Sequence, residues 1–499
     1  MMYQSTRDAS HKKYTAAEVI KMGLAPDGGL FIPETIPALT ADEITALCKE
    51  PYPVRAAKIL GKFLTDYTYD ELLADCTAAY CEASFPGGAA PLVHVHDHIY
   101  SLELWHGPTA AFKDMALQIM PRLLSRALTK TGETRDALIL VATSGDTGKA
   151  ALEGYKDIDR IRIMVFYPVD GVSRVQKLQM ATQTGNNVNV TAIYGNFDDA
   201  QTGVKNIFSD KAMAEALDKE GYVLSSANSI NWGRLAPQIV YYVSAYCDLL
   251  SKGAIQMGEA MDVCVPTGNF GNIFAAYIAK LMGLPIRHFV CASNKNNILT
   301  DFLRTGTYDR NRAFHLTMSP SMDILISSNL ERLLCFTAGE DATAAYMASL
   351  KNTGAYTVDD VVKSAIAENF SGYFADESAT AATIQNYYND YNYLPDTHTA
   401  VALSAAEQYL ADKGEAVVPM VVASTASPYK FAADVYTSLS GGEKLPKDPL
   451  SALDQLTEET GVAIPYPLCG LAERKVRFEE VIKAEDMPAA VLAYCKSQA

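Results

Sequence analysis

Lys113 has the sequence surroundings of a reactive amine. It follows Phe112 and precedes an apolar helical run in the stretch HGPTAAFKDMALQ, residues 106–118. A lysine in such a place can extend its amine along a helix face to solvent, which is the commoner arrangement. If the amine is buried, its pKa is lowered, and it can form a Schiff base with an aldehyde cofactor such as pyridoxal phosphate. That cofactor would also need a separate site for its phosphate.

Two loops rich in small residues are candidate anion sites. Each follows an apolar strand and opens a helix, so its backbone N–H groups lie at the positive end of the helix dipole, where glycine lets an anion come close. Glycine at such a turn often only makes the turn, so one loop alone is a weak indication, and two strengthen each other. The first loop is Thr143, Ser144, Gly145, Asp146, Thr147 and Gly148, and the second is Gly268, Asn269, Phe270, Gly271 and Asn272.

Two segments that look similar do not fit phosphate binding. SGDTGKA resembles a P-loop, but Gly145 and Gly148 are too close together, and Ala150 follows Lys149 where a magnesium-binding hydroxyl should stand. In YGNFDDAQTG the triplet GNF is repeated, but two aspartates follow it, and carboxylates at a helix start cap the helix and repel phosphate. We therefore expect no ATPase loop, and we expect the second segment to be structural.

Three histidines at alternate positions raise the question of a metal site. In HVHDHIY, His94, His96 and His98 would share one face if the segment were a single strand. A histidine stripe on a partly exposed strand or turn needs no metal, and no nearby cysteine or HExxH motif completes a ligand set. We expect no metal ion here.

The composition of the 499 residues favours a globular protein that binds small molecules. Apolar residues make up 49% and charged residues 20%, which suits two or three packed domains. A net charge of −16 argues against nucleic acid and anionic membranes as partners, while local helix ends can still bind a small anion. Nine scattered cysteines, no apolar leader and no apolar run of about 20 residues predict a reduced cytoplasmic protein without a membrane span.

Apolar runs that alternate with helical patterns predict an α/β fold with parallel sheets covered by helices. The expected buried strands are ALILVAT, RIRIMVFYP, NVNVTAIYG, MDVCVPTG and VVPMVVAS. Residues 15–90 read as helices broken by the loops APDGGLFIPETIP and EPYPV. The acidic, tyrosine-rich stretch FSGYFADESATAATIQNYYNDYNYLPD is expected to be mostly helical and to be an insertion at the periphery.

Five segments resemble, in order and approximate spacing, the motifs of the threonine synthase family. They are HGPTAAFKDMALQ, ATSGDTGKAALEG, SSANSINWGRLAPQIVYY, PTGNFGNIFAAYIAK and STASPYKF. The opening, YQSTR with YTAAEVIKMGLAPDGGLFIPE, is similar to the longer subclass with an extended N-terminal region. The resemblance covers most of the chain and is weakest between about residues 335 and 390.

The resemblance implies the fold of the tryptophan synthase β group. In that fold, two parallel-sheet α/β subdomains hold the cofactor between them, and a mostly helical N-terminal region precedes them. The implied regions are residues 1–90 for the N-terminal region, 91–435 for the catalytic region with a smaller subdomain at about 136–255, and 436–499 for a C-terminal segment.

The resemblance further implies a carbon–oxygen lyase that depends on pyridoxal 5′-phosphate. Such an enzyme converts O-phospho-L-homoserine and water to L-threonine and phosphate by γ-elimination and β-addition of water. Lys113 would be the Schiff-base lysine and the proton shuttle, and the hydroxyl of Thr425 would hydrogen-bond the pyridine nitrogen. Many members have histidine where this chain has Ser427, which is a departure from the family pattern. The cofactor phosphate would be held by Gly268, Asn269, Phe270, Gly271 and Asn272.

The family also implies two contacts for the substrate. In NSINWGR, the substrate phosphate would be bound by Asn228, Ser229 and Arg234, the last through charge-assisted bonds. A surface salt bridge is the alternative role for this arginine. The substrate carboxylate would be received on backbone N–H and hydroxyl groups of the first loop, and the Asp146 side chain would point away or cap the helix. The residues assigned to this carboxylate site are Thr143, Ser144, Asp146 and Thr147.

Two other functions remain open at this point. A related pyridoxal-phosphate lyase, such as threonine dehydratase or cysteine synthase, would need no second phosphate site. A catalytically inactive homologue would only bind ligand. For the threonine synthase function, a monomer or a homodimer is expected, and we expect one domain to close on the other around the substrate because the intermediates must be kept from water.

Overall fold

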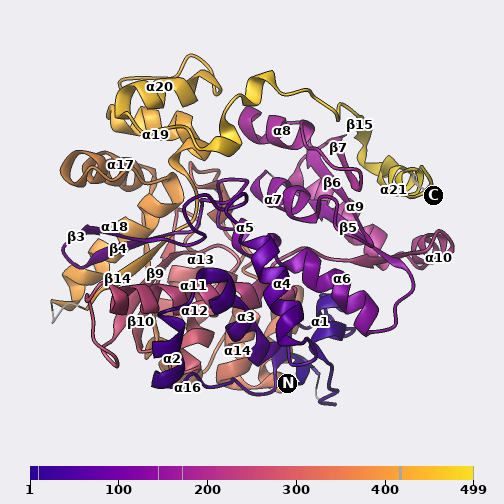
Figure 1. The fold of residues 1–499 in the computed structure, drawn as a ribbon, viewed down its shortest axis with the longest axis horizontal. Helices are drawn as coiled ribbons and strands as arrows, with labels where there is room; N and C mark the ends of the chain where they lie inside the picture. Colours follow the sequence, from indigo (N-terminus) through magenta and orange to yellow (C-terminus); the bar gives the residue numbers. More distant parts are fainter. Residues whose placement is uncertain (9, 144, 171, 415–417, 498–499) are drawn as a thin grey trace.

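Mostly parallel sheets form the framework of the molecule, with helices packed around them (Figure 1). The computed structural model describes residues 1–8, 10–143, 145–170, 172–414 and 418–497. Within these ranges, none of the helices combines the length and the apolar character that a membrane crossing needs. The α/β architecture expected from the alternating pattern is confirmed.

The larger sheet carries the elements that hold the candidate lysine and the second small-residue loop. Its neighbouring strands run parallel, except that β3 and β4 form an antiparallel hairpin. Every residue of β9 and β14 is buried, as strands covered on both faces require. In order across the sheet the strands are β13 (Phe370–Phe374), β10 (Ile286–Ser293), β9 (Met261–Pro266), β14 (Met420–Ser424), β4 (Ile99–Glu103) and β3 (Leu92–His96).

The smaller sheet carries the first small-residue loop, and all of its neighbouring strands run parallel. In order they are β15 (Val481–Lys483), β7 (Val188–Tyr194), β6 (Ile161–Pro168), β5 (Asp136–Ala142) and β8 (Tyr222–Ser225). Because β15 pairs with β7, the C-terminal segment returns to the edge of this sheet (Figure 1). The five strands expected from the sequence are confirmed as β5, β6, β7, β9 and β14.

The N-terminal region is mostly helical, as expected. Three of its helices begin at a capping box, in which Thr15, Thr40 or Thr68 exchanges hydrogen bonds with a glutamate three residues later. An antiparallel pair of short strands, β1 (Tyr3–Ser5) and β2 (Phe31–Pro33), was not expected, because β2 lies within a stretch that reads as loop. The helices are α1 (Ala16–Met22), α2 (Ala41–Leu47), α3 (Tyr52–Phe63) and α4 (Tyr69–Ala79).

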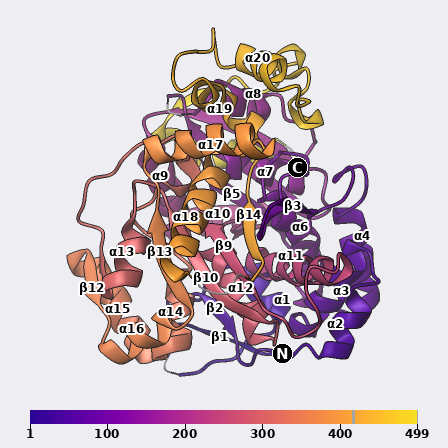
Figure 2. The same cartoon turned by 90° about the vertical axis from the view of Figure 1, so that its left-hand side faces the viewer.

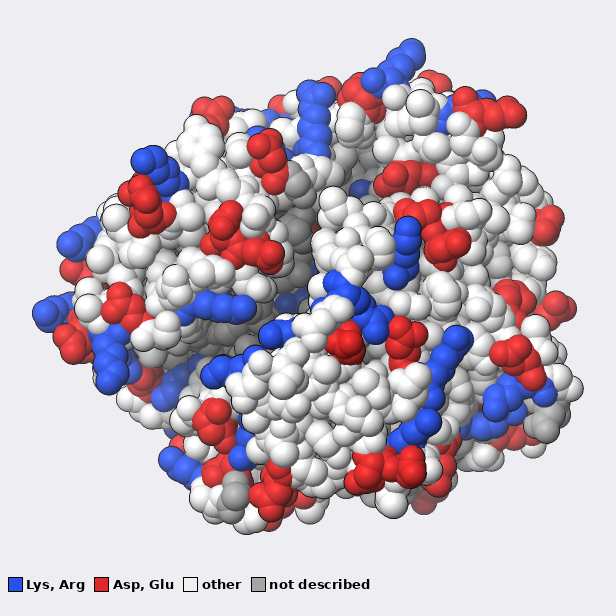
Figure 3. Space-filling model, turned by 180° about the vertical axis from the view of Figure 1, so that it is seen from behind, with Lys and Arg blue, Asp and Glu red and all other residues white. Residues whose placement is uncertain are grey.

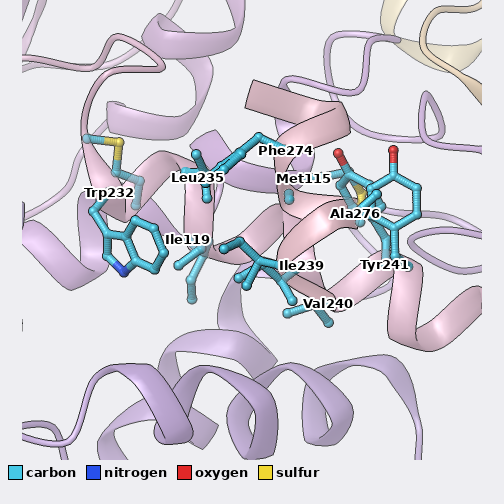
Figure 4. Close-up of a cluster of buried hydrophobic side chains, with 14 of the residues drawn as sticks. Met115, Ile119, Trp232, Leu235, Ile239, Val240, Tyr241, Phe274 and Ala276 are labelled. Carbon is cyan, nitrogen blue, oxygen red and sulfur yellow. The ribbon is translucent and has the colours of Figure 1, made fainter. Parts of the chain in front are cut away.

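Helix α11 (Trp232–Ser251) is buried along most of its length. Figure 4 shows Trp232, Leu235 and Ile239 of this helix among side chains from two other helices, with Met115 from α5 (Asp114–Leu117) and Phe274 from α12 (Gly271–Leu281). Each of these helices begins at or beside a candidate site residue. The same apolar core therefore fixes where the three helix N-termini lie.

The other helices cover the sheets or connect them (Figures 1 and 2). Two further short strands, β11 (Thr307–Asp309) and β12 (Ala355–Thr357), form a separate antiparallel pair. The helices are α6 (Met120–Lys130), α7 (Asp146–Tyr155), α8 (Arg174–Ala181), α9 (Phe197–Ser209), α10 (Lys211–Lys219), α13 (Ile298–Thr305), α14 (Leu330–Ala338), α15 (Glu340–Thr353), α16 (Asp360–Ala367), α17 (Glu377–Tyr391), α18 (Thr397–Lys413), α19 (Ala432–Leu439), α20 (Ser451–Thr460) and α21 (Met487–Lys496).

The tyrosine-rich stretch differs in part from its expected structure. Most of it is helical, as α17, but it begins with β13, which pairs with β10 at the edge of the larger sheet. The expectation that the whole stretch is a peripheral insertion is therefore wrong for its first residues. Gly372 allows this packing, because a Cβ there would lie 2.7 Å from Cα of Thr300 in α13.

Candidate active site

Lys113 is buried, with only 8% of its surface exposed. Its Nζ donates to Oγ of Ser321 at 3.3 Å and lies 3.8 Å from Oδ2 of Asp146. Burial lowers the pKa of Lys113 to about 8, the nearby cations Arg234 and Lys430 act in the same direction, and Asp146 opposes them. The solvent-exposed alternative for this lysine is therefore wrong, and with this pKa about a tenth of the amine is unprotonated at pH 7, far more than for an ordinary lysine.

A backbone pairing brings the Lys113 loop to the loop after β14. The N–H of Phe112 donates to the carbonyl of Thr425 at 2.8 Å, and the N–H of Ser427 donates to the carbonyl of Ala110 at 3.0 Å. Thr425 is also buried, and its backbone carbonyl lies against the residue before Lys113. The Ser427 hydroxyl accepts a hydrogen bond from a backbone N–H two residues later, so this side chain stabilises its own turn.

The second small-residue loop lies against the same serine that contacts Lys113. A Cβ on Gly268 would lie 2.7 Å from the carbonyl oxygen of Ser321, so a larger residue would push the two loops apart. Phe270 has a left-handed backbone with φ of 61°, which turns the chain sharply into α12. Ser321 therefore links the loop before α12 to the buried amine.

Asn272 provides an unsatisfied donor at this helix N-terminus. Its Oδ1 accepts from the hydroxyls of Tyr241 and Tyr242 at 2.6 and 2.5 Å, which fixes the orientation of the amide. Its Nδ2 is buried and has no partner among the described residues. A buried donor of this kind is costly unless a ligand accepts from it, and a helix N-terminus favours an anion. The loop thus fits the phosphate of the expected cofactor.

Arg234 forms a second cationic position, in the first turn of α11. It is buried, its guanidinium donates to the carbonyl of Ala227 at 2.8 Å, and no ion pair joins it to a carboxylate in the described part of the chain. Burial lowers its pKa to about 10, while the nearby Tyr155 acts in the opposite direction. The Tyr155 hydroxyl is itself buried and unpartnered among these residues. An uncompensated guanidinium beside a free hydroxyl suits an anionic ligand.

The other predicted members of the second anion site lie on the loop before α11. Asn228 is exposed, and Ser229 is half-buried. The Oγ of Ser229 accepts from Nδ2 of Asn329 at 3.4 Å, and the same amide donates to the carbonyl of Asn269 at 2.9 Å. Asn329 thus links the loop of the second anion site to the loop at α12.

The first small-residue loop makes a tight turn at the start of α7. The hydroxyl of Thr143 accepts from the N–H groups of Gly145 and Gly148, at 2.9 and 3.0 Å. Thr147 is half-buried in the first turn. Ser144, which was also predicted to bind the substrate, lies outside the described residues. The arrangement leaves the roles of these residues toward a carboxylate as predictions.

The side chain of Asp146 has a different environment from the one expected. It neither caps α7 nor points away from the site, because its carboxylate accepts from Lys430 at 2.8 Å and from Gln176 at 2.9 Å. Burial by itself would raise the pKa of Asp146, but the ammonium groups of Lys430 and Lys113 outweigh burial and lower it. A second carboxylate would be repelled by this ionised side chain, so only the backbone of residue 146 could receive one.

Several residues beside the lysine were not predicted from the sequence. Ser321 contacts Lys113, and its N–H donates to Nε2 of His398 at 3.1 Å, which makes His398 part of the same network. Lys430, Asn329 and Tyr155 also surround the site, as described above. Lys430 lies within the STASPYKF motif, so its position near Thr425 was the available signal. The other residues come from segments with no distinctive pattern.

The charge around the site is opposite in sign to that of the whole chain. Lys113, Arg234 and Lys430 are grouped with Asp146, whereas the chain carries −16. Figure 3 also shows a hollow on the back of the molecule with lysine and arginine side chains along its border. Anionic ligands are therefore favoured locally, which agrees with the expectation that a small anion can bind despite the negative charge of the whole chain.

The three histidines do not share one strand. His96 ends β3, and the chain turns at Asp97 before β4 begins at Ile99, so His98 lies in the turn. The His96 ring stacks on Tyr391 with centroids 3.9 Å apart. Among the described residues no cluster of three potential metal ligands is present.

The repeated GNF triplet in YGNFDDAQTG begins a helix. Asn196 and Asp199 form a capping box at α9, which confirms the structural interpretation of this segment.

Comparison with known families places the chain in a class of enzymes. Residues 84–423 match the family model of pyridoxal-phosphate dependent enzymes, which places the catalytic region in that class. Residues 2–80 match the threonine synthase N terminus, and residues 399–491 match the threonine synthase C-terminal region. The chain therefore belongs to the threonine synthase family of pyridoxal-phosphate-dependent enzymes, which confirms the expected family, fold and cofactor.

Individual relatives agree with this placement. Threonine synthase-like 1 of Macaca fascicularis is 41% identical over 435 residues, which cover 85% of this chain but only 58% of that protein. Threonine synthase of Pseudomonas aeruginosa is 38% identical over 440 residues, covering 86% of this chain and 89% of the relative. The crystal structure of PLP-bound threonine synthase from Brucella melitensis superposes with a TM-score of 0.86 at 37% identity, covering 99% of this chain and all of the other.

Proposed function

We propose that this protein is a threonine synthase that converts O-phospho-L-homoserine and water to L-threonine and phosphate, the last step of threonine biosynthesis. The observation that carries the proposal is the pair of separate anion positions, one at the N-terminus of α12 and one at Arg234. A phosphorylated substrate and a phosphorylated cofactor need two such positions. A dehydratase acting on a free amino acid would need one, and Arg234 would then be a buried cation without a purpose.

The residues present fit pyridoxal phosphate. The loop of Gly268, Asn269, Phe270, Gly271 and Asn272 would hold its phosphate, Lys113 would bind it covalently, and the Thr425 hydroxyl would contact the ring nitrogen. When bound, the cofactor supplies an electron-withdrawing ring that delocalises negative charge next to the substrate amine. A neutral hydroxyl at the ring nitrogen would leave the ring less electron-withdrawing than a carboxylate partner would.

Lys113 is proposed to move protons at the reacting carbon atoms. Its pKa of about 8 lets Nζ accept a proton near neutral pH and return it later in the cycle. The hydrogen bond to Ser321 holds Nζ at one position, and burial keeps water from competing for the proton. Arg234 would bind and orient the substrate phosphate through the γ-elimination, and the turn at residues 143–147 would bind the substrate carboxylate through its N–H groups.

Other parts of the proposal follow from the same assignment. The enzyme would be a carbon–oxygen lyase that acts on a small molecule in the cytoplasm as a monomer or homodimer, without nucleic acid or membrane partners. We place an N-terminal region at residues 1–90, a catalytic region at 91–435 and a C-terminal segment at 436–499. The smaller subdomain, at about 136–255, would close on the rest when substrate binds.

One experiment separates the candidate functions. The purified chain is loaded with pyridoxal phosphate and incubated with O-phospho-L-homoserine, and both phosphate and threonine are measured. Equal amounts of the two products are expected. Phosphate with 2-oxobutyrate in place of threonine would indicate an abortive lyase, and substrate binding without any product would indicate an inactive homologue.

A further inference from the structure

A buried ion pair beside Lys113 joins the two sheets of the molecule. Asp146 is the first residue of α7, which follows β5 of the smaller sheet. Lys430 lies in the short 3-10 helix Pro428–Phe431, which follows β14 of the larger sheet. Oδ1 of Asp146 and Nζ of Lys430 are 2.8 Å apart, and the side chain of Lys430 is fully buried. Family resemblance assigned no role to Lys430.

Lys430 is held by acceptors on three sides. Besides Asp146, its Nζ donates to the carbonyl of Thr109 at 3.1 Å and to Oε1 of Gln179 at 3.2 Å. An ammonium group has three N–H donors, so Lys430 has none left for a ligand. It therefore acts on the site through Asp146 and through its charge, and it does not serve as a further anion receptor.

The carboxylate of Asp146 is fixed in one orientation. Oδ1 accepts from Lys430 and from Nε2 of Gln176 at 2.9 Å, which leaves Oδ2 directed to Nζ of Lys113 at 3.8 Å. The glycine before it is required, because a Cβ on Gly145 would lie 2.4 Å from the Gln176 amide. Oδ2 is thus available as a counter-ion for Lys113.

We propose that Asp146 and Lys430 are positioning residues that together set how readily Lys113 holds a proton, with Asp146 stabilising the ammonium form and Lys430 limiting that effect. The proposal rests on the assignment of Lys113 as the reactive amine in the proposed function. A buried ion pair contributes little net stability compared with an apolar pair of the same size. The geometry, in which one carboxylate oxygen serves each cation, points to a role beyond packing.

The opposing effects of the two residues can be worked out from the charges around Lys113. The groups that face it are Asp146 and Asp114, which raise its pKa, and Arg234 and Lys430, which lower it. His398 is connected to it only through Ser321. Removing the Asp146 charge leaves only Asp114 to oppose the cations, so the Lys113 pKa must fall. Removing the Lys430 charge leaves Asp146 to pair with Lys113 alone, so the Lys113 pKa must rise.

The test measures cofactor capture by the cofactor-free full-length chain. Cofactor is removed with hydroxylamine, pyridoxal phosphate is added at pH 6 to 10, and the rate of covalent capture is followed by absorbance. Borohydride reduction and peptide mass spectrometry confirm that Lys113 is the site. Only the unprotonated amine reacts, so the midpoint of the pH–rate curve reports the protonation of Lys113. Titration of the cofactor itself is common to all variants.

The variants are Asp146→Asn, Lys430→Gln and the double variant. Relative to a parent midpoint near pH 8, we expect Asp146→Asn to move the midpoint down by about one unit and Lys430→Gln to move it up by about one unit. Well below the midpoint, capture then becomes about tenfold faster in the first variant and about tenfold slower in the second. The double variant removes both charges and should return toward the parent midpoint. Lys430→Arg keeps the positive charge, so its midpoint should stay at that of the parent.

Shifts in the same direction, or no shift in either single variant, would overturn the proposal and leave the pair a packing feature. If Lys430→Gln does not fold, the double variant, which buries no charge at the pair, still tests the idea against Asp146→Asn. Its midpoint must then lie above that of the single variant. No amino-acid substrate is present in the assay, so a chain that shows these shifts but does not form threonine would refute the proposed function and support the pair's role.

Discussion

Replacing Arg234 with methionine should weaken substrate binding without reducing the stability of the free protein. In the free protein this guanidinium is buried, has no carboxylate partner among the residues that the structure describes and has a pKa lowered to about 10 by burial. The empty protein therefore bears a cost for holding the charge. Methionine fills similar volume without that cost, so the unfolding temperature of the cofactor-loaded, substrate-free variant should be unchanged or higher.

The loss of binding can be estimated from the contact that Arg234 is proposed to make. A hydrogen bond to a charged group is worth about 1.5 to 3 kcal/mol, and about 1.4 kcal/mol corresponds to a factor of ten. If the guanidinium binds the substrate phosphate, the KM for O-phospho-L-homoserine should rise roughly 10- to 150-fold. Arg234→Lys keeps the charge but loses the planar pair of donors, so its KM should lie between that of the parent and that of Arg234→Met.

Arg55, in the neighbouring helix α3, offers a matched control. It is also a buried arginine that contacts α11, where it donates to Oδ1 of Asp248 at 2.8 Å and to Oγ of Ser244 at 2.6 Å. Arg55→Met leaves both groups without their partner, so it should lower the free energy of unfolding by about 1.5 to 3 kcal/mol. The printed hydrogen bonds of Arg55 go to residues outside the two proposed anion positions, so the KM for O-phospho-L-homoserine should not change.

The assay combines initial rates of phosphate release with thermal unfolding in the absence of substrate. The reasoning requires opposite outcomes: a raised KM with retained stability for Arg234→Met, and a lowered stability with retained KM for Arg55→Met. Inhibition by inorganic phosphate should also weaken in the Arg234 variant alone. An unchanged KM in Arg234→Met, or equal losses of stability in both variants, would show that Arg234 is a structural residue.

Three further outcomes follow from the structure. Burial lowers the Lys113 pKa from 10.5 to about 8, so between those values the unfolded chain binds more protons than the folded one and stability rises with pH. We compare the unfolding free energies of the cofactor-free parent and the cofactor-free Lys113→Met variant. Between pH 8 and 10.5 the parent should gain about 3 kcal/mol relative to the variant. A difference that does not change with pH would contradict a buried ammonium. Gly154→Ala should destabilise the fold severely in denaturant titrations, because its Cβ would lie 1.9 Å from the carbonyl of Leu117, whereas Gly61→Ala, with its nearest atom at 3.6 Å, should be neutral or stabilising by up to about 1 kcal/mol. Gly268→Ala should weaken cofactor binding in equilibrium titrations by at least tenfold, with little change in the fold, and tight binding in that variant would show that the loop need not approach so closely.

Local patterns explain which features could be predicted from the sequence. The strands β5, β6, β7, β9 and β14 are mostly apolar, so they can be identified without knowing their neighbours. The loops that follow β5 and β9 carry glycine where the turn requires it, as Gly145 with φ of 146° shows. Lys113 was identifiable because its motif combines an aromatic residue, a lysine and an apolar helix within a few positions.

Contacts between distant segments explain what the sequence could not provide. Ser321 is 208 positions from Lys113, and Lys430 is 321 positions from the Thr109 carbonyl that it binds. Ser321 belongs to no distinctive motif, and although Lys430 lies in STASPYKF, the motif does not reveal its distant partners. The error about Asp146 has the same origin, since an aspartate at a helix start is usually a cap, and only the partner from the other sheet changes its role.

The N-terminal region takes part in the same framework through one guanidinium. Arg332 is fully buried and donates to the carbonyl of Phe31 in β2 at 2.9 Å and to the carbonyl of Ile230, before α11, at 2.6 Å. It also donates to Asn329, whose amide contacts the loops of both anion positions. A single cation therefore connects β2 to the two loops, so a displacement of the N-terminal strands would be transmitted to both proposed anion positions. The region that reads from sequence as a separate helical cap is thus structurally continuous with the site.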